Sequence, residues 1–173
     1  MKETLQDLKT RRSCRKYRSE QIKEEELDEI LEAGMYAPTG MGMQSPLIVA
    51  IQDKKTRDLL SKMNADIMGT DTDPFYGAPT VLVVLADKER RTYLDDGNMV
   101  IANLLNAAHA VGVDSCYIYR AKEEFDSPEG QALLKQWGIE GNYAGIGHVI
   151  LGYGLPEGIK EAAPRKENYI VRV

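Results

Sequence analysis

Residue types that build many functional sites are scarce in this chain of 173 residues, which has two cysteines, two histidines and one tryptophan. Cys14 and Cys116 show no CxxC or Cys/His spacing, so neither a zinc site nor a redox pair is indicated, and both thiols are expected to be reduced. His109 and His148 fall in separate predicted elements and form no catalytic set with a serine, a cysteine or an acid. We therefore predict no metal site and identify no catalytic side chain.

Long apolar runs and phosphate-binding loops are also missing. No stretch approaches the roughly 18 uninterrupted apolar residues of a membrane-spanning helix, and the N-terminal sequence MKETLQDLKTRR lacks the apolar core of a signal peptide. A cytoplasmic protein without a membrane partner is therefore expected. Neither GxGxxG nor GxxxxGKS/T occurs at a strand-to-helix junction, which argues against a dinucleotide-binding Rossmann fold and a P-loop.

The charge of the chain is acidic overall but unevenly distributed. Lysine and arginine number 22 against 27 aspartates and glutamates, a net charge of −5, so non-specific affinity for nucleic acid cannot explain the function. Residues 9–18 (KTRRSCRKYR) nevertheless hold six basic side chains and no acid. A length of 173 residues, with 28% charged and 43% hydrophobic residues, is typical of a single globular domain, residues 1–173. The sequence thus predicts a local anion site inside an acidic domain.

Hydrophobic periodicity predicts helices that separate most of the strands. The expected helices are 2–11, 23–36, 54–63, 96–112 and 127–137. The expected strands are 47–51, 81–85, 115–119 and 145–153. Residues 64–77 are expected to be irregular, and residues 164–173 are expected to be extended. The uniformly apolar strand 81–85 indicates a sheet covered on both faces by helices. In the helix 96–112, capped by Asp95 or Asp96, apolar residues surround nearly the whole circumference, which predicts burial on all sides with help from a partner subunit.

Two segments offer groups that could hold a ligand. In an extended chain, alternation would place Arg11, Ser13 and Arg15 on one side, where guanidinium and hydroxyl donors suit a phosphate; a solvated basic surface is the alternative. A second basic pair, Arg165 and Lys166, could close on the same anion. The loop 37–46 has backbone that can approach a flat ligand at its two glycines, or it is simply a turn. Binding segments without an acid, base or nucleophile are expected where a cofactor performs the chemistry.

Six segments, in this order, resemble motifs of the nitroreductase-like FMN-dependent oxidoreductases. They are residues 11–17 (RRSCRKY, similar to RRSxRxF/Y), 37–46 (APTGMGMQSP, similar to APSxxNxQPW), 77–81 (GAPTV, similar to GAPxxI/V), 96–118 (similar to a long central helix and the strand after it), 145–153 (GIGHVILGY, similar to GxxxxxxGY) and 164–166 (PRK, similar to a basic tail). The resemblance covers nearly the whole chain. It implies an α+β fold, a three-layer α/β/α sandwich with a mixed sheet, that forms a homodimer with two FMN molecules held between the subunits.

The resemblance also implies which residues contact the cofactor. The FMN phosphate would be held by Arg11, Arg12, Ser13 and Arg15, with Arg165 or Lys166. The flavin would be reached from the partner subunit by Pro38, Thr39, Gly40 and Gly42, and the ribityl chain and the pyrimidine edge would be contacted by Gln44 and Asn64. The N5 side of the ring would receive backbone amides from Tyr119 and Arg120. Such amides would stabilise negative charge on the reduced flavin. The chain departs from the family pattern at Gly42, where asparagine is usual, and at Ser45, which interrupts the usual Gln-Pro-Trp.

The activity that the resemblance implies is that of an FMN-dependent NAD(P)H oxidoreductase. Hydride would pass from NADH or NADPH to flavin N5, and the reduced flavin would pass electrons, in a ping-pong sequence, to a small-molecule acceptor such as a nitroaromatic or a quinone. One alternative keeps the fold with flavin-fragmenting or dehalogenating chemistry. A second is a flavin-binding or sensing module without turnover, which the altered loop at Gly42 and Ser45 leaves open. A nucleic-acid role for the basic segment is a further, weaker alternative.

Overall fold

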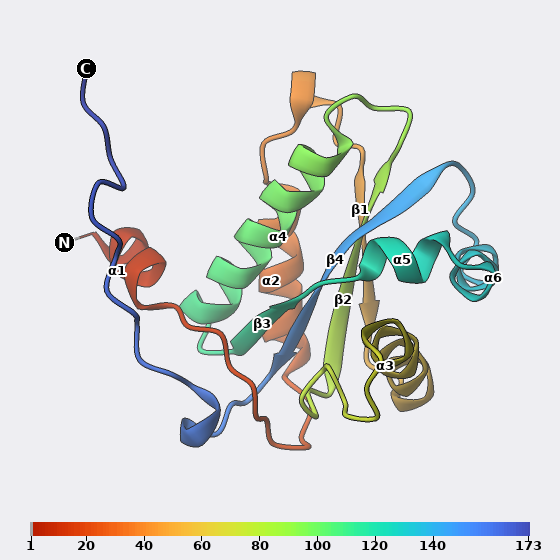
Figure 1. Cartoon of the computed structure of the whole chain (residues 1–173), viewed down its shortest axis with the longest axis horizontal. Coiled ribbons are helices and arrows are strands. Elements are labelled where there is room, and N and C mark those ends of the chain that lie inside the picture. Colours follow the sequence, from red (N-terminus) through yellow and green to blue (C-terminus); the bar gives the residue numbers. More distant parts are fainter. Residues whose placement is uncertain (1) are drawn as a thin grey trace.

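The computed structural model describes residues 2–173 and builds them around one antiparallel sheet (Figure 1). The four strands, β1 (Pro46–Ile51), β2 (Thr80–Asp87), β3 (Asp114–Ile118) and β4 (Tyr143–Gly152), lie in the order β1-β2-β4-β3. The expected mixed sheet is wrong, because all three ladders are antiparallel and the parallel contact is an isolated bridge between Ser13 and Ser115. The helix-containing connections from β1 to β2 and from β3 to β4 join antiparallel neighbours, so they do not act as crossovers between parallel strands.

The central strand β2 is buried on both faces, as its uniformly apolar sequence predicts. Its side chains from 81 to 86 have no exposed surface. One face belongs to a core cluster with Val81, Val83 and Leu85, and the other face to a second cluster with Leu82 and Val84. A sheet with two hydrophobic faces needs cover on both, because apolar surface left in water is unfavourable.

Helices provide that cover on both faces. The helices α2 (Glu24–Met35) and α4 (Tyr93–Ala110) contribute to the cluster of Leu82, whereas α3 (Lys54–Met68), α5 (Ala121–Asp126) and α6 (Pro128–Gln136) contribute to the cluster of Val83. The short helix α1 (Glu3–Thr10) contacts α4, and its Thr10 hydroxyl lies 2.8 Å from His109 Nε2. The short turns η1 (Gly40–Gly42) and η2 (Pro156–Gly158) complete the chain.

Glycines in β4 allow the helices to approach the sheet closely. A Cβ at Gly145 would lie 2.1 Å from the carbonyl oxygen of Ala121, the first residue of α5, and a Cβ at Gly147 would meet the ring of Tyr117 at 2.4 Å. Both distances are shorter than atoms can tolerate without movement. The glycine-punctuated strand therefore fixes how near α5 lies to the sheet.

Two helices extend beyond their predicted ends. The helix predicted over 54–63 continues to Met68, so the expectation of irregular chain from residue 64 is wrong for its first five residues; Gly69, at φ +72, ends the helix instead. The helix predicted from 96 begins at Tyr93, with Thr92 rather than an aspartate at the N-cap. Asp96 does not cap this helix, because its carboxylate accepts hydrogen bonds from the Gly40 amide and the Thr92 hydroxyl.

Helix α4 is not buried on all sides within one chain. Val100, Ile101 and Leu104 face the core, but Leu94 and Met99 keep 48% and 43% of their surface exposed. The layers of one chain cover only one side of this helix, and its burial on the other sides by a partner subunit stays a prediction. Of the helices in residues 2–173, none is both long enough and apolar enough to cross a bilayer.

Candidate functional site

The basic segment that follows α1 runs extended along the β3 edge of the sheet. The Cys14 amide donates to the Ser115 carbonyl oxygen at 3.0 Å, and the Arg15 amide donates to the Gly158 carbonyl oxygen at 2.9 Å. The segment is thus held between β3 on one side and the chain after β4 on the other (Figure 1). Because both sides hold its backbone, the side chains of this segment occupy defined positions.

Side chains of this segment divide between the core and the surface. Cys14 is fully buried and Tyr17 nearly so, and the Tyr17 hydroxyl donates to the Cys14 carbonyl oxygen at 2.8 Å. Ser13 and Arg15 flank Cys14, and extended chain places neighbouring side chains on opposite sides. Arg15 is accordingly exposed and Ser13 half-buried.

The Cys116 thiol on β3 indicates where the polar side chains of the segment gather. Burial raises the pKa of this thiol, while a hydrogen bond from Ser13 and the positive charges of Arg15 and Arg11 act to lower it. The bridge between Ser13 and Ser115 holds the segment beside β3, and alternation along the extended chain places Arg11, Ser13 and Arg15 on one side. We call these three residues the basic patch.

Arg11 contributes a donor that the protein itself does not satisfy. Among the described residues, its Nη1 atom is buried without a hydrogen-bond partner, as is the Oγ atom of Ser115. A buried donor without an acceptor costs free energy, and a charged donor costs more than a neutral one. A turn of the Arg11 side chain toward the basic patch would let an anion satisfy this donor, and guanidinium and hydroxyl donors are the set that a phosphate prefers.

A cleft opens beside the basic patch, between the end of β3 and the loop after α3. It has a volume of about 240 Å³, and Arg15 and Arg120 bring positive charge to its walls. Its lining consists of Arg15, Met68, Thr72, Asp73, Pro74, Tyr76, Cys116, Tyr117, Ile118, Tyr119 and Arg120. Three residues predicted at the cofactor, Arg15, Tyr119 and Arg120, therefore meet at this β3 cleft.

Asn64 lies behind the cleft rather than on its surface. It has no exposed surface, and its amide nitrogen donates to the Tyr119 carbonyl oxygen at 2.7 Å and to Glu124. Its amide oxygen accepts from Arg120 Nη1 at 3.4 Å. Within this chain the Asn64 side chain is enclosed and its donors are already used, and its contact with the ribityl chain or the pyrimidine edge stays a prediction.

The remaining basic candidates do not join the basic patch within one chain. Arg12 Nη1 donates to the carbonyl oxygens of Lys9 and Arg11, so the structure turns it onto its own backbone. Arg165 donates to the Ala163 carbonyl oxygen, and the Lys166 ammonium lies over the Tyr169 ring at 5.3 Å, both in the exposed tail. Their assignment to the phosphate stays a prediction.

The glycine-rich loop predicted to reach the flavin lies at the other end of the sheet. Pro46, where the loop meets β1, pairs with Ala86, whereas Ser115 beside the basic patch pairs with Leu151 at the opposite end of the central strands. Figure 1 shows η1 at the top and the basic segment at the left and bottom. Within one chain, Pro38, Thr39, Gly40, Gly42 and Gln44 therefore do not reach the β3 cleft.

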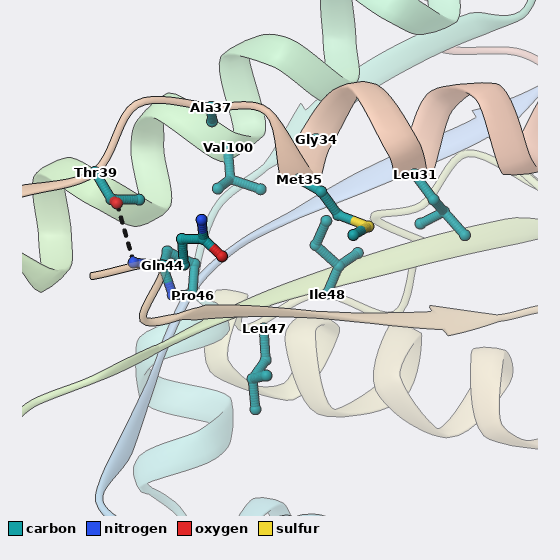
Figure 2. A pocket seen from close by; sticks show the side chains of 10 residues that line it. All are labelled: Leu31, Gly34, Met35, Ala37, Thr39, Gln44, Pro46, Leu47, Ile48 and Val100. Carbon is teal, nitrogen blue, oxygen red and sulfur yellow. Dashed lines mark hydrogen bonds between the residues drawn. The ribbon is translucent and has the colours of Figure 1, made fainter. Parts of the chain in front are cut away.

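The same loop borders a second, apolar groove of about 420 Å³ (Figure 2). The groove lies between α2 and β1, and its lining consists of Leu31, Gly34, Met35, Ala37, Thr39, Gln44, Pro46, Leu47, Ile48 and Val100. Thr39 Oγ1 accepts from the Gln44 amide at 3.0 Å, which fixes the loop at its rim. The lining offers no charged side chain, so this groove lacks the cationic donors that suit a phosphate.

Sequence reasoning missed several residues of the β3 cleft. The wall formed by residues 72–74 and Tyr76 carries no motif, and the segment was expected only to be irregular. The sequence predicts Ser115 and Cys116 only as strand residues. The pairing of Ser115 with Ser13 is a β-bridge, which no sequence spacing reveals. Glu124 was also missed, since an acid in a short helix is usually exposed, yet here it is fully buried.

Known proteins and solved structures resemble this chain along most of its length. The model of the nitroreductase family matches residues 8–71. A protein of Archaeoglobus fulgidus, provisionally named as an NADH dehydrogenase/NAD(P)H nitroreductase, is 31% identical over 91% of this chain and 88% of its own length. The FMN reductase [NAD(P)H] of Bacillus subtilis is 30% identical over 66% of this chain, which spans 46% of that protein. A crystal structure of a Bacteroides fragilis nitroreductase with bound FMN superposes with a TM-score of 0.91 at 28% identity, covering all of both chains.

Proposed function

Because the chain belongs to the nitroreductase family, we propose that it is an FMN-dependent oxidoreductase that takes electrons from NADH or NADPH and passes them to a small organic acceptor. Relatives named NAD(P)H nitroreductase and FMN reductase support the oxidoreductase class. A ping-pong sequence and an acceptor of the nitroaromatic or quinone type are the finer parts of this proposal. We retain the three-layer arrangement, the homodimer and a cytoplasmic location as parts of it as well.

The observation that carries the proposal is the unsatisfied Arg11 Nη1 beside Ser13 and Arg15. These donors fit the terminal phosphate of FMN, since each can direct N–H or O–H groups at a dianion. The β3 cleft begins at Arg15 and continues along Tyr119 and Arg120, which gives a flat ring system a place next to the phosphate. The residues present therefore fit FMN.

The chain's own groups bind and orient rather than transfer protons. Arg11, Ser13 and Arg15 would neutralise the phosphate and fix one end of the cofactor, and the apolar part of the cleft wall at Met68 and Ile118 would keep water from the ring. When bound, FMN supplies a carrier that accepts a hydride and returns electrons to a second substrate. A cofactor with this chemistry explains why the cleft needs no catalytic acid, base or nucleophile.

A homodimer would complete the site. The loop 37–46 and the tail residues Arg165 and Lys166 do not reach the β3 cleft of their own chain, although they match family motifs. The exposed Leu94 and Met99 on α4 give a second copy an apolar surface to cover. We therefore place the loop of one subunit at the cleft of the other.

The experiment that tests the cofactor assignment compares FMN with riboflavin, which carries the same ring without the phosphate. Titrations followed by flavin fluorescence should show FMN binding at least tenfold more tightly, because the basic patch contacts only the phosphate. Equal affinity for the two flavins would remove the basic patch from the site. A colourless protein that takes up neither flavin would overturn the proposed function.

A further inference from the structure

Three buried polar side chains lie directly behind the β3 cleft and have no role in the function proposed above. Asn64 on α3, Glu124 on α5 and His148 on β4 have no exposed surface. Glu124 Oε1 accepts from the Asn64 amide nitrogen and lies 3.0 Å from His148 Nε2. The three residues therefore form one chain of hydrogen bonds that links three elements.

The cluster ends on a backbone turn in an unfavourable conformation. Arg120, which precedes α5, has φ +81 and ψ 6, in the left-handed region that favours glycine. Asn64 holds both sides of this turn, since it donates to the Tyr119 carbonyl oxygen at 2.7 Å and accepts from Arg120 Nη1 at 3.4 Å. Glu124 adds a third restraint through its amide, which donates to the Arg120 carbonyl oxygen at 3.0 Å.

Aromatic rings surround the cluster and separate it from solvent. The His148 ring lies 5.3 Å from the ring of Phe75 and 6.4 Å from that of Phe125. Glu124 Oε2 and His148 Nδ1 have no hydrogen-bond partner among the described residues. Apolar residues of similar size would fill this space without leaving polar atoms unsatisfied. Packing alone therefore does not explain why polar residues occupy these positions.

We propose that Asn64, Glu124 and His148 form a positioning device that holds the Tyr119–Arg120 turn in its left-handed conformation at the wall of the cofactor cleft. The inference rests on the proposed function, because the turn matters only if the cleft binds the cofactor. Tyr119 and Arg120 both line the cleft, so a change in the turn alters its shape and the direction of the turn's backbone groups. Because the three residues have no exposed surface, we assign their effect to the turn and not to contact with the cofactor.

The test combines Asn64→Ala with two substitutions of Arg120. Asn64→Ala removes the restraint and should weaken FMN binding about tenfold or more. In the Arg120→Gly background the same change should cost less than about threefold, because glycine adopts φ +81 without a Cβ penalty. In the Arg120→Ala background the full loss should persist. Arg120→Ala is the matched control, since it removes the contact with Asn64 as Arg120→Gly does but keeps the Cβ.

A second readout needs no cofactor. Hydrogen exchange of the amides from 119 to 124 in FMN-free protein should accelerate on Asn64→Ala and return toward the wild-type rate when Arg120→Gly is added. Equal FMN losses and equal exchange in the glycine and alanine backgrounds would overturn the proposal, as would failure of Asn64→Ala to fold in every background. Wild-type protein that binds no FMN would instead refute the proposed function, and the exchange rates would still decide whether the three side chains hold the turn.

Discussion

At the scale of single residues, the basic patch combines one exposed and one partly buried arginine. Arg15 is solvated, whereas Arg11 has a buried donor atom with no acceptor in the protein. A group that is left unsatisfied by the fold but can be satisfied by a ligand contributes to binding and not to the stability of the free protein. We therefore expect a substitution of Arg11 to lower the affinity for FMN without lowering the stability of the FMN-free protein.

Arg11→Met should weaken FMN binding roughly ten- to hundredfold, as expected for the loss of a hydrogen bond to a charged group. The melting temperature of the FMN-free protein should stay the same or rise, because the substitution removes a buried donor atom that has no acceptor and keeps a similar volume. Arg18→Ala is the control, since Arg18 is exposed and pairs with Glu20 at the surface. A variant that binds FMN as well as the wild type does would show that Arg11 is not at the phosphate.

At the scale of elements, Asp73 organises the loop that forms one wall of the β3 cleft. Its carboxylate accepts from Arg57 Nη2 and Ser61 Oγ, both at 2.5 Å, and from the amides of Phe75 and Gly77 at 2.8 and 2.7 Å. Burial acts to raise the pKa of Asp73, but these hydrogen bonds outweigh it and hold the pKa below its ordinary value. The ionised form is thus the one that the folded loop stabilises.

Asp73→Asn should lower the free energy of unfolding by about 1–2 kcal/mol at pH 7, toward the lower end of the range for a charged hydrogen-bonded group, because the side chain is partly solvated. The contribution of Asp73 is present above the unfolded-state pKa of about 4 and disappears as the pH falls through the lower folded-state pKa. Urea denaturation at a series of pH values should therefore show wild type and variant converging in acid. A constant difference down to pH 2 would contradict this account.

The sequence predicts most elements because their signals are local. Short apolar runs, helical periodicity and turn residues locate β1 to β4 and α2, and Ser127 caps α6 as expected. The predictions are wrong where a tertiary contact determines the local structure. The Asp96 carboxylate accepts a hydrogen bond from the amide of Gly40, in a distant loop, instead of capping α4. The ladders are antiparallel because the chain places strands of opposite direction side by side, in the order β1-β2-β4-β3.

The sequence likewise predicts some residues of the candidate site and misses others. Arg15, Tyr119 and Arg120 were chosen from motifs, and the fold brings them to one cleft. Asn64 is assigned to the ligand by the family resemblance alone. Its hydrogen-bond partners in the fold, Tyr119 and Glu124, lie 55 and 60 residues further along the chain, where no local signal reveals them. The left-handed Arg120 carries no sequence signal, since glycine or asparagine is the usual residue in that conformation.

At the scale of the whole molecule, the exposed apolar residues favour a dimer. Leu94 and Met99 on α4 are about half exposed, and the tail carries Tyr169, Ile170 and Val171 with 72–79% of their surface exposed. Isolated exposed apolar residues are common, but groups of them usually mark an interface. The functional unit that we propose therefore contains two chains, each supplying part of both sites.

Met99→Asp should shift the protein toward monomers and lower its FMN affinity in the same samples, because a carboxylate in an apolar interface must be desolvated. Light scattering coupled to size-exclusion chromatography measures the first effect, and flavin fluorescence measures the second. Ala132→Asp adds the same charge at an exposed position of α6 on the other face of the sheet and should change neither. A Met99→Asp protein that stays dimeric would place the interface elsewhere.

The central claim is that the chain binds FMN at the β3 cleft and reduces it with a nicotinamide donor. Anaerobic mixing of the FMN-loaded protein with NADH, and separately with NADPH, tests this claim most directly. The account predicts that at least one donor rapidly bleaches the yellow absorbance of the bound flavin, and that added quinone or nitroaromatic restores it. Flavin that binds tightly but is bleached by neither donor would contradict the account and would favour a flavin-binding module without turnover.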